Sequence, residues 1–131
     1  MVKLTFCLRR RPDLSPEEFS RYWREEHGPL VVARAEALGI RRYQQVHTVD
    51  EPQLHAALQA RNGGAPPPYD GIAEVWVDSV QAFRSGSDEA SRAAAAELLA
   101  DERNFIDLPN STMWLGVEHE LVNQLDGYSA G

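Results

Sequence analysis

The stretch "LRRRPDLSPEEFSRYWREEHGPL", residues 8–30, contains both the start and the interruption of the first predicted helix. Ser15 fits an N-cap position, Pro16 fits the first helical position, and Glu18 completes an S-x-x-E capping box. Phenylalanine, tyrosine and tryptophan then recur at helical spacing, which gives the helix one apolar stripe. These features predict a helix over residues 16–26.

The same stretch predicts a corner at its end, where histidine, glycine and proline follow one another. Pro29 has no N–H group and its ring clashes with the carbonyl four residues back, so a straight helix cannot continue. A new or kinked helix is predicted over residues 30–38, and Gly39 ends it. Since His27 lies four residues after Trp23, at the edge of the apolar stripe, we expect it at the corner and facing partly inward.

Outside this stretch, four segments alternate between apolar and polar residues, which is the pattern of β-strands. The predicted strands cover residues 2–9, 40–49, 69–79 and 111–122. Further helical segments are predicted at residues 51–60, 79–85 and 88–105, with a loop at 61–68. The order β-α-β-β-α-β is that of a ferredoxin-like α+β fold with one four-stranded antiparallel sheet. The helices cover one sheet face, so the other face is available for a homodimer.

Length, composition and charge restrict the class of protein. A chain of 131 residues with 43% hydrophobic and 25% charged residues is typical of one globular domain. The net charge of −7 argues against a nucleic-acid partner. No stretch approaches about 20 apolar residues, so no membrane span is expected. Cys7 is the single cysteine, which excludes an intramolecular disulfide and leads us to expect a cytoplasmic protein.

The sequence contains none of the common spacings for a metal or phosphate site. Its four histidines lie far apart, without an H-x-H, H-E-x-x-H or C-x-x-C pattern. A glycine-rich phosphate loop, a G-x-S-x-G elbow and a dinucleotide fingerprint are also missing. We therefore expect no metal site and no cofactor.

The chain resembles the EthD-like family of the dimeric α+β barrel superfamily. The resemblance rests on the stretch quoted above, on "YDGIAEVWVDS" in the third strand, and on "DERNFIDLPNSTMWLGVEHELV" at the end. Its most specific parts are "HGPL" and the "DE..FID" turn before the last strand. It covers residues 1–122, which form the predicted domain, and leaves residues 123–131 as a C-terminal tail. The insertion around residues 50–68 is longer than the family pattern.

The resemblance implies a homodimer whose two sheets form a central barrel, with a ligand pocket between each sheet and its helices. Relatives include proteins of ether degradation, cyclases and dehydratases of aromatic polyketides, haem-degrading monooxygenases and cofactor-free monooxygenases. Membership therefore defines the scaffold and leaves the chemistry open.

Three histidines and one tyrosine are candidates for chemistry. His27 matches the histidine of the "HGPL" motif, and an imidazole with a pKa of about 6.5 exchanges protons at neutral pH. The alternative is a corner histidine satisfied by a backbone carbonyl. His119 continues the apolar face of the last predicted strand, which places it at the rim of the pocket. His47 falls at the end of the second strand, on the same face as Tyr43.

Aromatic residues are candidates for ligand contact, with packing in the core as the alternative. Tyr22, Trp23, Trp76 and Phe105 are the candidates for flanking a planar, hydrophobic ligand. Asp107, in the turn before the last strand, is explained as a turn or capping residue. In the family pattern it would also orient a histidine.

These observations favour a cofactor-free small-molecule enzyme with cyclase or dehydratase chemistry on an aromatic or polyketide-like substrate. The reaction would begin with proton abstraction next to a carbonyl, with His27 as general base or acid. Tyr43 or His119 would donate a hydrogen bond to the developing enolate oxygen. Two alternatives remain: a monooxygenase, in which haem or the substrate itself activates oxygen, and a ligand-binding accessory protein without turnover.

Overall fold

The structure, a computed structural model, describes residues 1–85 and 88–125. Its single sheet contains β1 (Val2–Leu8), β2 (Arg42–His47), β3 (Gly71–Val77) and β4 (Met113–Gly116). The strand order is β2-β3-β1-β4, and all neighbouring strands are antiparallel. The helices are α1 (Pro16–Tyr22), α2 (Gly28–Arg34), α3 (Pro52–Arg61), α4 (Val80–Ser85) and α5 (Glu89–Glu102). A π-helical turn, η1 (Trp23–His27), lies between α1 and α2, and a 3-10 turn, η2 (Leu108–Asn110), precedes β4.

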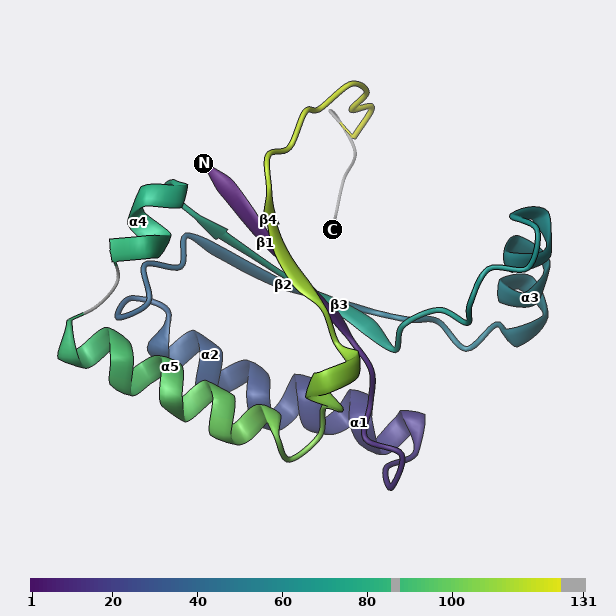
Figure 1. Cartoon of the computed structure of the whole chain (residues 1–131), viewed down its shortest axis with the longest axis horizontal. Helices are drawn as coiled ribbons and strands as arrows, with labels where there is room; N and C mark the ends of the chain where they lie inside the picture. Colours follow the sequence, from purple (N-terminus) through teal and green to yellow (C-terminus); the bar gives the residue numbers. More distant parts are fainter. Residues whose placement is uncertain (86–87, 126–131) are drawn as a thin grey trace.

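The expected ferredoxin-like arrangement is confirmed. The helices α1, α2 and α5 lie on one face of the sheet, as Figure 1 shows. The other face has no helix across it in this view. The helix α3, which carries no buried residue, stands away from the body of the molecule. The candidate site lies in the layer between the sheet and the three packed helices.

The predicted start of the first helix is confirmed, but its predicted interruption is different. The Ser15 hydroxyl accepts a hydrogen bond from the backbone N–H of Glu18, whose side chain accepts one from the N–H of Ser15. At the other end the helix does not break before Pro29. Instead, the N–H of Gly28 bonds to the carbonyl of Trp23, five residues back, and α2 continues to Arg34. A π-helical turn shifts the hydrogen-bond ladder by one residue, and this shift accommodates the proline without ending the helix.

The sheet register decides which side chains face the helices. Leu4 pairs with Val75 and Phe6 with Ala73, and these residues share the face toward α1, α2 and α5. Gly71 follows on the same face, where a Cβ atom would lie 2.4 Å from Cζ3 of Trp23. A glycine is required here because the indole ring of Trp23 lies directly on the strand.

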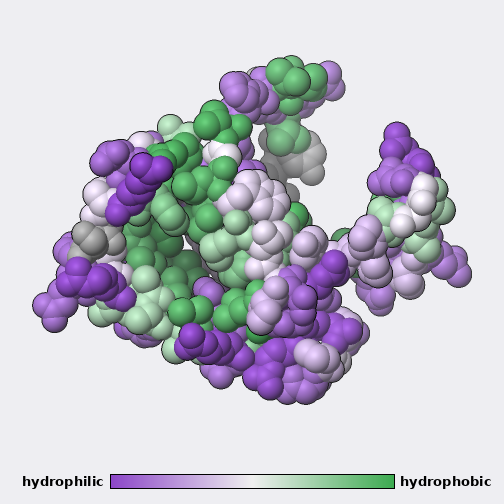
Figure 2. All heavy atoms as spheres, in the orientation of Figure 1, coloured by the Kyte–Doolittle hydropathy of each residue, from purple (hydrophilic) through white to green (hydrophobic). Residues whose placement is uncertain are grey.

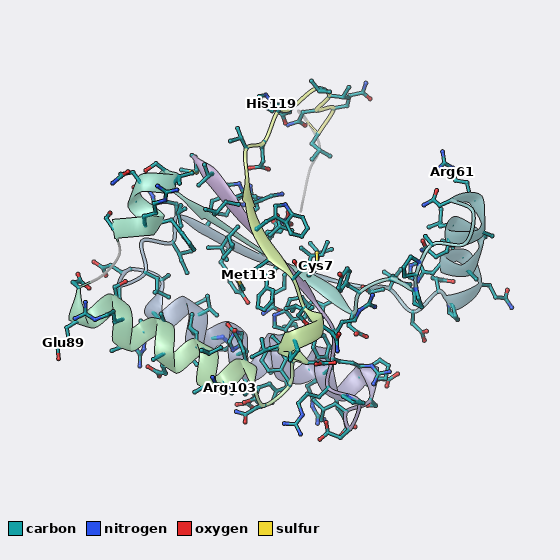
Figure 3. All side chains as sticks on the ribbon, viewed as in Figure 1. Cys7, Arg61, Glu89, Arg103, Met113 and His119 are labelled. Atoms are coloured by element: carbon teal, nitrogen blue, oxygen red, sulfur yellow. The ribbon has the colours of Figure 1, made fainter. Side chains whose placement is uncertain are left out.

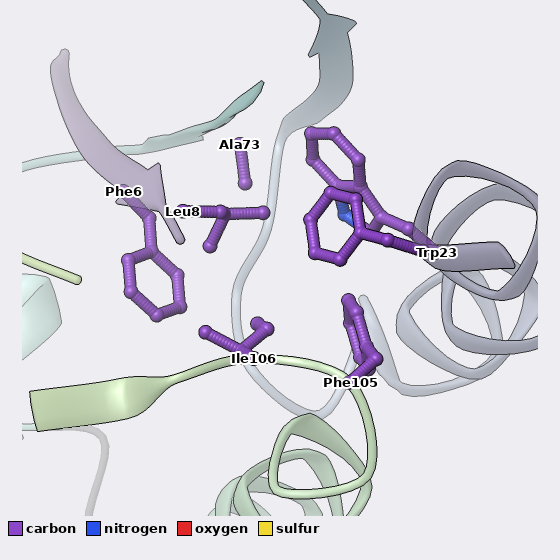
Figure 4. Packing of buried hydrophobic residues seen from close by; sticks show 7 residues of the cluster. Phe6, Leu8, Trp23, Ala73, Phe105 and Ile106 are labelled. Carbon is purple, nitrogen blue, oxygen red and sulfur yellow. The ribbon is translucent and has the colours of Figure 1, made fainter. Parts of the chain in front are cut away.

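The hydrophobic core fills one end of the layer between sheet and helices. It contains Phe6, Leu8, Phe19, Trp23, Ala73, Phe105 and Ile106. Figure 4 shows Trp23 and Phe105 on one side of this cluster and the strand residues Phe6 and Leu8 on the other. The ring of Phe19 lies 5.6 Å from the rings of both Trp23 and Phe105, measured between centroids. Such tilted aromatic contacts fix the end of α1 and the segment after α5 against the sheet.

The last strand is shorter than the predicted span of residues 111–122. The pairing of Lys3 with Gly116 would bring Val117 opposite Val2, where β1 begins. Beyond that point β4 has no backbone to pair with, so His119 does not continue its face. The predicted tail at residues 123–131 is described only to residue 125, and the remainder lies outside the described residues. Within the described part of the chain, no helix has the length and apolar character needed to cross a membrane.

Candidate functional site

An apolar cavity of about 230 Å³ lies between the sheet and the helices. Its wall is largely aliphatic and includes Leu4, Val31, Val75, Val77, Leu98 and Met113. Figure 2 shows hydrophobic surface gathered in a hollow between the sheet and α5. In the described wall, His27, Tyr43 and Glu102 are the titratable groups. A mainly apolar cavity with a few convergent polar groups is the usual form of a small-molecule site.

His27 is oriented by a carboxylate from the distant end of α5. Its Nδ1 lies 2.7 Å from Oδ2 of Asp101. An ionised carboxylate only accepts hydrogen bonds, so Nδ1 carries the proton and Nε2 presents its lone pair. The expected alternative, a corner histidine bonded to a backbone carbonyl, is thus replaced by a histidine–carboxylate pair.

Asp101 is held in its ionised form by three donors. Burial opposes ionisation, but hydrogen bonds from Tyr22, His27 and Asn104 lower the pKa of Asp101 below its ordinary value. The Tyr22 hydroxyl donates to Oδ1 at 2.5 Å, and the Asn104 amide donates to the same oxygen at 3.2 Å. A carboxylate with these partners has one orientation, and it transmits that orientation to His27.

Burial keeps the imidazole of His27 neutral at pH 7. The residue is only 5% exposed, and its ring centroid lies 5.0 Å from that of Phe105. Burial lowers the pKa of His27 below its ordinary value, although the hydrogen bond and charge of Asp101 act in the opposite direction. A neutral imidazole with a fixed tautomer is the form required of a general base.

Glu102, the next residue after Asp101, has the opposite protonation behaviour. Burial, and secondly the negative charge of Asp101, raises the pKa of Glu102 to about 7. Its Oε2 lies 3.9 Å from Nε2 of His27, which is beyond hydrogen-bond length. Two adjacent carboxyl groups whose environments separate their pKa values are a common arrangement for assigning acid and base roles. Here Asp101 stays ionised, while a large fraction of Glu102 is protonated at neutral pH.

Tyr43 brings a hydroxyl from β2 to the same cavity. Its oxygen accepts a hydrogen bond of 2.7 Å from the amide of Gln45. Burial raises the pKa of Tyr43, so the phenol is protonated at neutral pH and is able to donate. The cavity therefore combines a neutral imidazole, a carboxyl group that titrates near 7 and a phenol.

Two residues expected at the pocket lie elsewhere. Trp76 is on the opposite sheet face, where its ring contacts Lys3 and Arg42. Strand alternation explains this position, since Val75 and Val77 occupy the cavity face. His119 is exposed, and Figure 3 shows it beyond the end of β4, far from α5. The prediction that Trp76 and His119 contact the pocket is therefore wrong for this structure, because neither residue lines the cavity.

The other predicted residues are split between the site and its surroundings. Trp23 lines the cavity, and Tyr22 reaches the site through Asp101. Phe105 is 0% exposed and packs in the core against His27. His47 stacks on Trp23, with centroids 4.2 Å apart, and borders a separate cleft next to α3.

Asp107 has a local role in the turn before β4. Its side chain accepts a hydrogen bond of 2.7 Å from the Asn110 amide, and its backbone carbonyl accepts one from Ser111. Among the described contacts it has none with a histidine. The carboxylate that orients His27 belongs to Asp101, six positions earlier.

Asp101 and Glu102 were not predicted as site residues, although the sequence contains a signal for them. They end α5, whose last turn contains no basic residue. Negative charge at a helix C-terminus interacts unfavourably with the helix dipole, so two adjacent acidic residues there need another explanation. No group of three or more metal-ligating side chains was found within the described residues.

The fold and the cavity define a ferredoxin-like α+β protein with an apolar cavity between its sheet and its helices. The EthD domain model matches residues 11–109, so the chain belongs to the EthD domain family.

Two curated relatives cover most of the chain. Decarboxylase AgnL1 of Paecilomyces divaricatus is 27% identical over 120 residues, covering 91% of this chain and 79% of that protein. Dehydratase aurZ of Gibberella zeae is 28% identical over 125 residues, covering 94% and 80% respectively.

Solved structures share the fold at lower identity. An EthD family protein of Bacillus halodurans aligns with a TM-score of 0.58 and 20% identity, covering 91% of this chain and 99% of that one. A dimeric ferredoxin-like protein of Thermobifida fusca aligns with a TM-score of 0.54 and 14% identity, covering 89% and 90%. At these identities the likeness is one of fold.

Proposed function

We propose that this protein is a cofactor-free small-molecule enzyme that carries out acid–base chemistry of the cyclase or dehydratase type. The observation that carries the proposal is the His27–Asp101 pair at an apolar cavity, with the carboxyl group of Glu102 3.9 Å from the imidazole. The relatives named decarboxylase and dehydratase support it. Loss of CO2 from a β-keto acid and loss of water from a β-hydroxy ketone can both pass through an enolate.

The cavity wall supports a hydrophobic substrate class. Aliphatic side chains and the indole of Trp23 favour a planar, mainly hydrophobic molecule, such as an aromatic or polyketide-like ketone. His27 and Glu102 lie 3.9 Å apart and Tyr43 lines the same cavity, so one oxygen-bearing part of the substrate would be directed toward these groups. The reaction is therefore expected at a carbon next to a carbonyl.

A dehydration uses each group once. Nε2 of His27 removes a proton from the carbon next to the carbonyl, and Asp101 stabilises the resulting imidazolium. Tyr43 donates a hydrogen bond to the enolate oxygen. Protonated Glu102 then gives its proton to the leaving hydroxyl, so that water departs and a C=C bond forms. Proton transfer from His27 back to Glu102 restores the starting state, and no oxidant or reductant is needed.

The uncovered sheet face supports a homodimer as part of the proposal. Val46 and Trp114 lie on this face and are 45% and 50% exposed. The similar Thermobifida fusca protein is named a dimeric ferredoxin-like protein. A second copy packed on this face would remove the exposed apolar surface from water. The cytoplasmic location expected from the single cysteine belongs to the same proposal.

Two small ketones test the reaction in separate steps. α-Tetralone, a fused-ring aryl ketone, reports proton abstraction through deuterium exchange of the CH2 group next to its carbonyl, followed by NMR. 3-Hydroxy-α-tetralone reports dehydration, because loss of water gives fluorescent 1-naphthol. We expect the protein to accelerate both reactions, and His27→Ala to slow both by about 10² to 10⁴.

Three outcomes would contradict the proposal. Binding of both ketones without acceleration would identify a ligand-binding protein. Unchanged rates in His27→Ala would remove the histidine from the chemistry. A stoichiometric haem band in the purified protein would contradict a cofactor-free enzyme.

A further inference from the structure

A line of four side chains connects α1 to the cavity through β2. The Ser20 hydroxyl lies 2.6 Å from Nδ1 of His47, and Nε2 of His47 lies 2.7 Å from Oε1 of Gln45. The Gln45 amide nitrogen lies 2.7 Å from the Tyr43 hydroxyl oxygen. Tyr43 lines the cavity, whereas His47 borders the cleft next to α3.

We propose that Gln45 is a positioning residue, held by His47, that fixes the Tyr43 hydroxyl as a hydrogen-bond donor toward the substrate oxygen. This inference deepens the proposed function and rests on it. Tyr43 is the residue that touches the substrate, and Gln45 and His47 act through it.

The direction of every hydrogen bond in the line follows from Gln45. Its terminal nitrogen also donates to the backbone carbonyl of Trp23 at 2.9 Å, and a carbonyl only accepts. The other terminal atom is therefore the oxygen, so Nε2 of His47 must carry a proton in order to donate to it. In the neutral ring Nδ1 then accepts from the Ser20 hydroxyl. Ser20, His47 and Gln45 thus each donate to the next side chain of the line, in the direction of the cavity.

The Tyr43 oxygen accepts from Gln45, which leaves its own proton free to donate. Burial raises the pKa of Tyr43, and the side chains of Gln45 and then Trp23 act in the opposite direction. Among the described hydrogen bonds, none has the Tyr43 hydroxyl as donor, and its proton is available to a substrate oxygen. A donor oriented before the substrate arrives needs no reorganisation during the reaction.

The fold explains why Gln45 keeps this orientation. Tyr43, Gln45 and His47 alternate along β2 and share the face toward the helices. His47 stacks on Trp23 with an interplanar angle of 32°, which fixes its ring. The π-helical turn shifts the backbone so that the Trp23 carbonyl accepts from both Gly28 and Gln45. The unusual turn in the first helix and the polar line on β2 therefore meet at one backbone atom.

The first experiment replaces Gln45 by Met, which has a similar length and shape and makes no strong hydrogen bond. We expect kcat for α-tetralone exchange to fall about 10-fold to 100-fold while KM changes less than about threefold, because the donor is lost mainly in the transition state. Gln44→Met is the matched control. Gln44 points to the other sheet face and donates to Glu74, so its replacement should leave both parameters unchanged.

A double mutant separates positioning from a structural effect. If Gln45 acts through Tyr43, then Gln45→Met should cost almost nothing in a Tyr43→Phe background, because the hydroxyl is already gone. An equal loss of kcat in both backgrounds would overturn the proposal. His47→Phe preserves the stack on Trp23 but cannot hold the Gln45 oxygen, and it provides the same comparison if Gln45→Met does not fold.

A second readout does not depend on any reaction. Ultraviolet difference titration against Tyr43→Phe follows ionisation of the Tyr43 phenol. Gln45→Met should raise the pKa of Tyr43, since it removes a hydrogen bond that lowers it. A shift in this pKa in a protein without ketone turnover would support the hydrogen-bond line and contradict the proposed function alone. An unchanged pKa would contradict the line itself.

Discussion

Nδ1 of His27 lies 2.7 Å from Oδ2 of Asp101, a residue 74 positions later in the chain. The two residues come from the π-helical turn η1 and the last turn of α5, which pack side by side on the sheet. Their contact decides which imidazole nitrogen carries the proton, and therefore which nitrogen is free to act as a base.

Asp101→Asn tests this contact directly. An asparagine of the same size is able to present its amide group to His27, which favours the tautomer with the proton on Nε2. We expect exchange of α-tetralone to slow roughly 10²-fold, within the range that a general base contributes. Glu97→Gln is the matched control, because Glu97 lies on the same helix and pairs only with Arg34 at the surface. Equal rates in the two variants would show that Asp101 does not set the tautomer.

Glu102→Gln should increase stability at alkaline pH. The pKa of Glu102 is about 7 in the folded state and 4.5 in the unfolded state. Between these two pH values, unfolding therefore releases a proton from Glu102. The free energy of unfolding therefore decreases as pH rises from about 4.5 to 7, by about 3 kcal/mol in total, and then levels off. Glutamine does not ionise and avoids this loss.

The measurement is urea unfolding of both proteins at pH 5 and pH 8. The variant should exceed the wild type by about 2–3 kcal/mol at pH 8 and by only about 1 kcal/mol at pH 5, where folded Glu102 is protonated and the pH lies close to the unfolded-state pKa of 4.5. The same difference at both values would mean that burial of Glu102 does not raise its pKa.

The two ketones should have different pH profiles. Exchange of α-tetralone needs only neutral His27, so its rate should fall in acid below the lowered pKa of that residue and remain level above it. Dehydration of 3-hydroxy-α-tetralone also needs protonated Glu102, so its rate should fall again above about pH 7. Glu102→Gln should slow dehydration and spare exchange. A similar effect on both reactions would remove Glu102 from the role of acid.

The fold was predictable because its signals are local. The alternation of residues 2–9 and the capping box at Ser15 each specify an element without reference to distant residues. The end of β4 was not predictable in this way, since it depends on the register against β1. The π-helical turn was also missed, because the proline rule assumes that the α-helical ladder continues unchanged.

The site was predictable only where a residue carries its chemistry by itself. His27 and Tyr43 were predicted from residue type and strand or helix position, and the structure places both at the cavity. Asp101 became visible only through its partner, and a contact across 74 positions leaves no periodic pattern. Its one local signal is an acidic pair at the C-terminal end of a helix, where negative charge interacts unfavourably with the helix dipole.

Gly71→Ala should be strongly destabilising. Its Cβ would lie 2.4 Å from Cζ3 of Trp23 and 2.8 Å from the Val46 carbonyl oxygen, and neither group is free to move. Overpacking of this kind costs about 1–3 kcal/mol or more, so the thermal midpoint should fall by several degrees. Gly116→Ala is the control, since no atom lies within 4 Å of a Cβ atom there. A normal midpoint for Gly71→Ala would mean that Trp23 does not pack against β3 as described.

The uncovered sheet face should bring two copies of the chain together in solution. Light scattering after size exclusion should give about twice the chain mass of 14.7 kDa at micromolar concentration. Trp114→Glu places a charge on this face, where burial against a second copy would cost several kcal/mol, so the variant should elute as a monomer. Val32→Glu adds the same charge at a position that is 69% exposed on α2, and it should leave the dimer intact. A wild-type mass of 14.7 kDa, or equal behaviour of the two variants, would assign the exposed apolar residues of the sheet to some other contact.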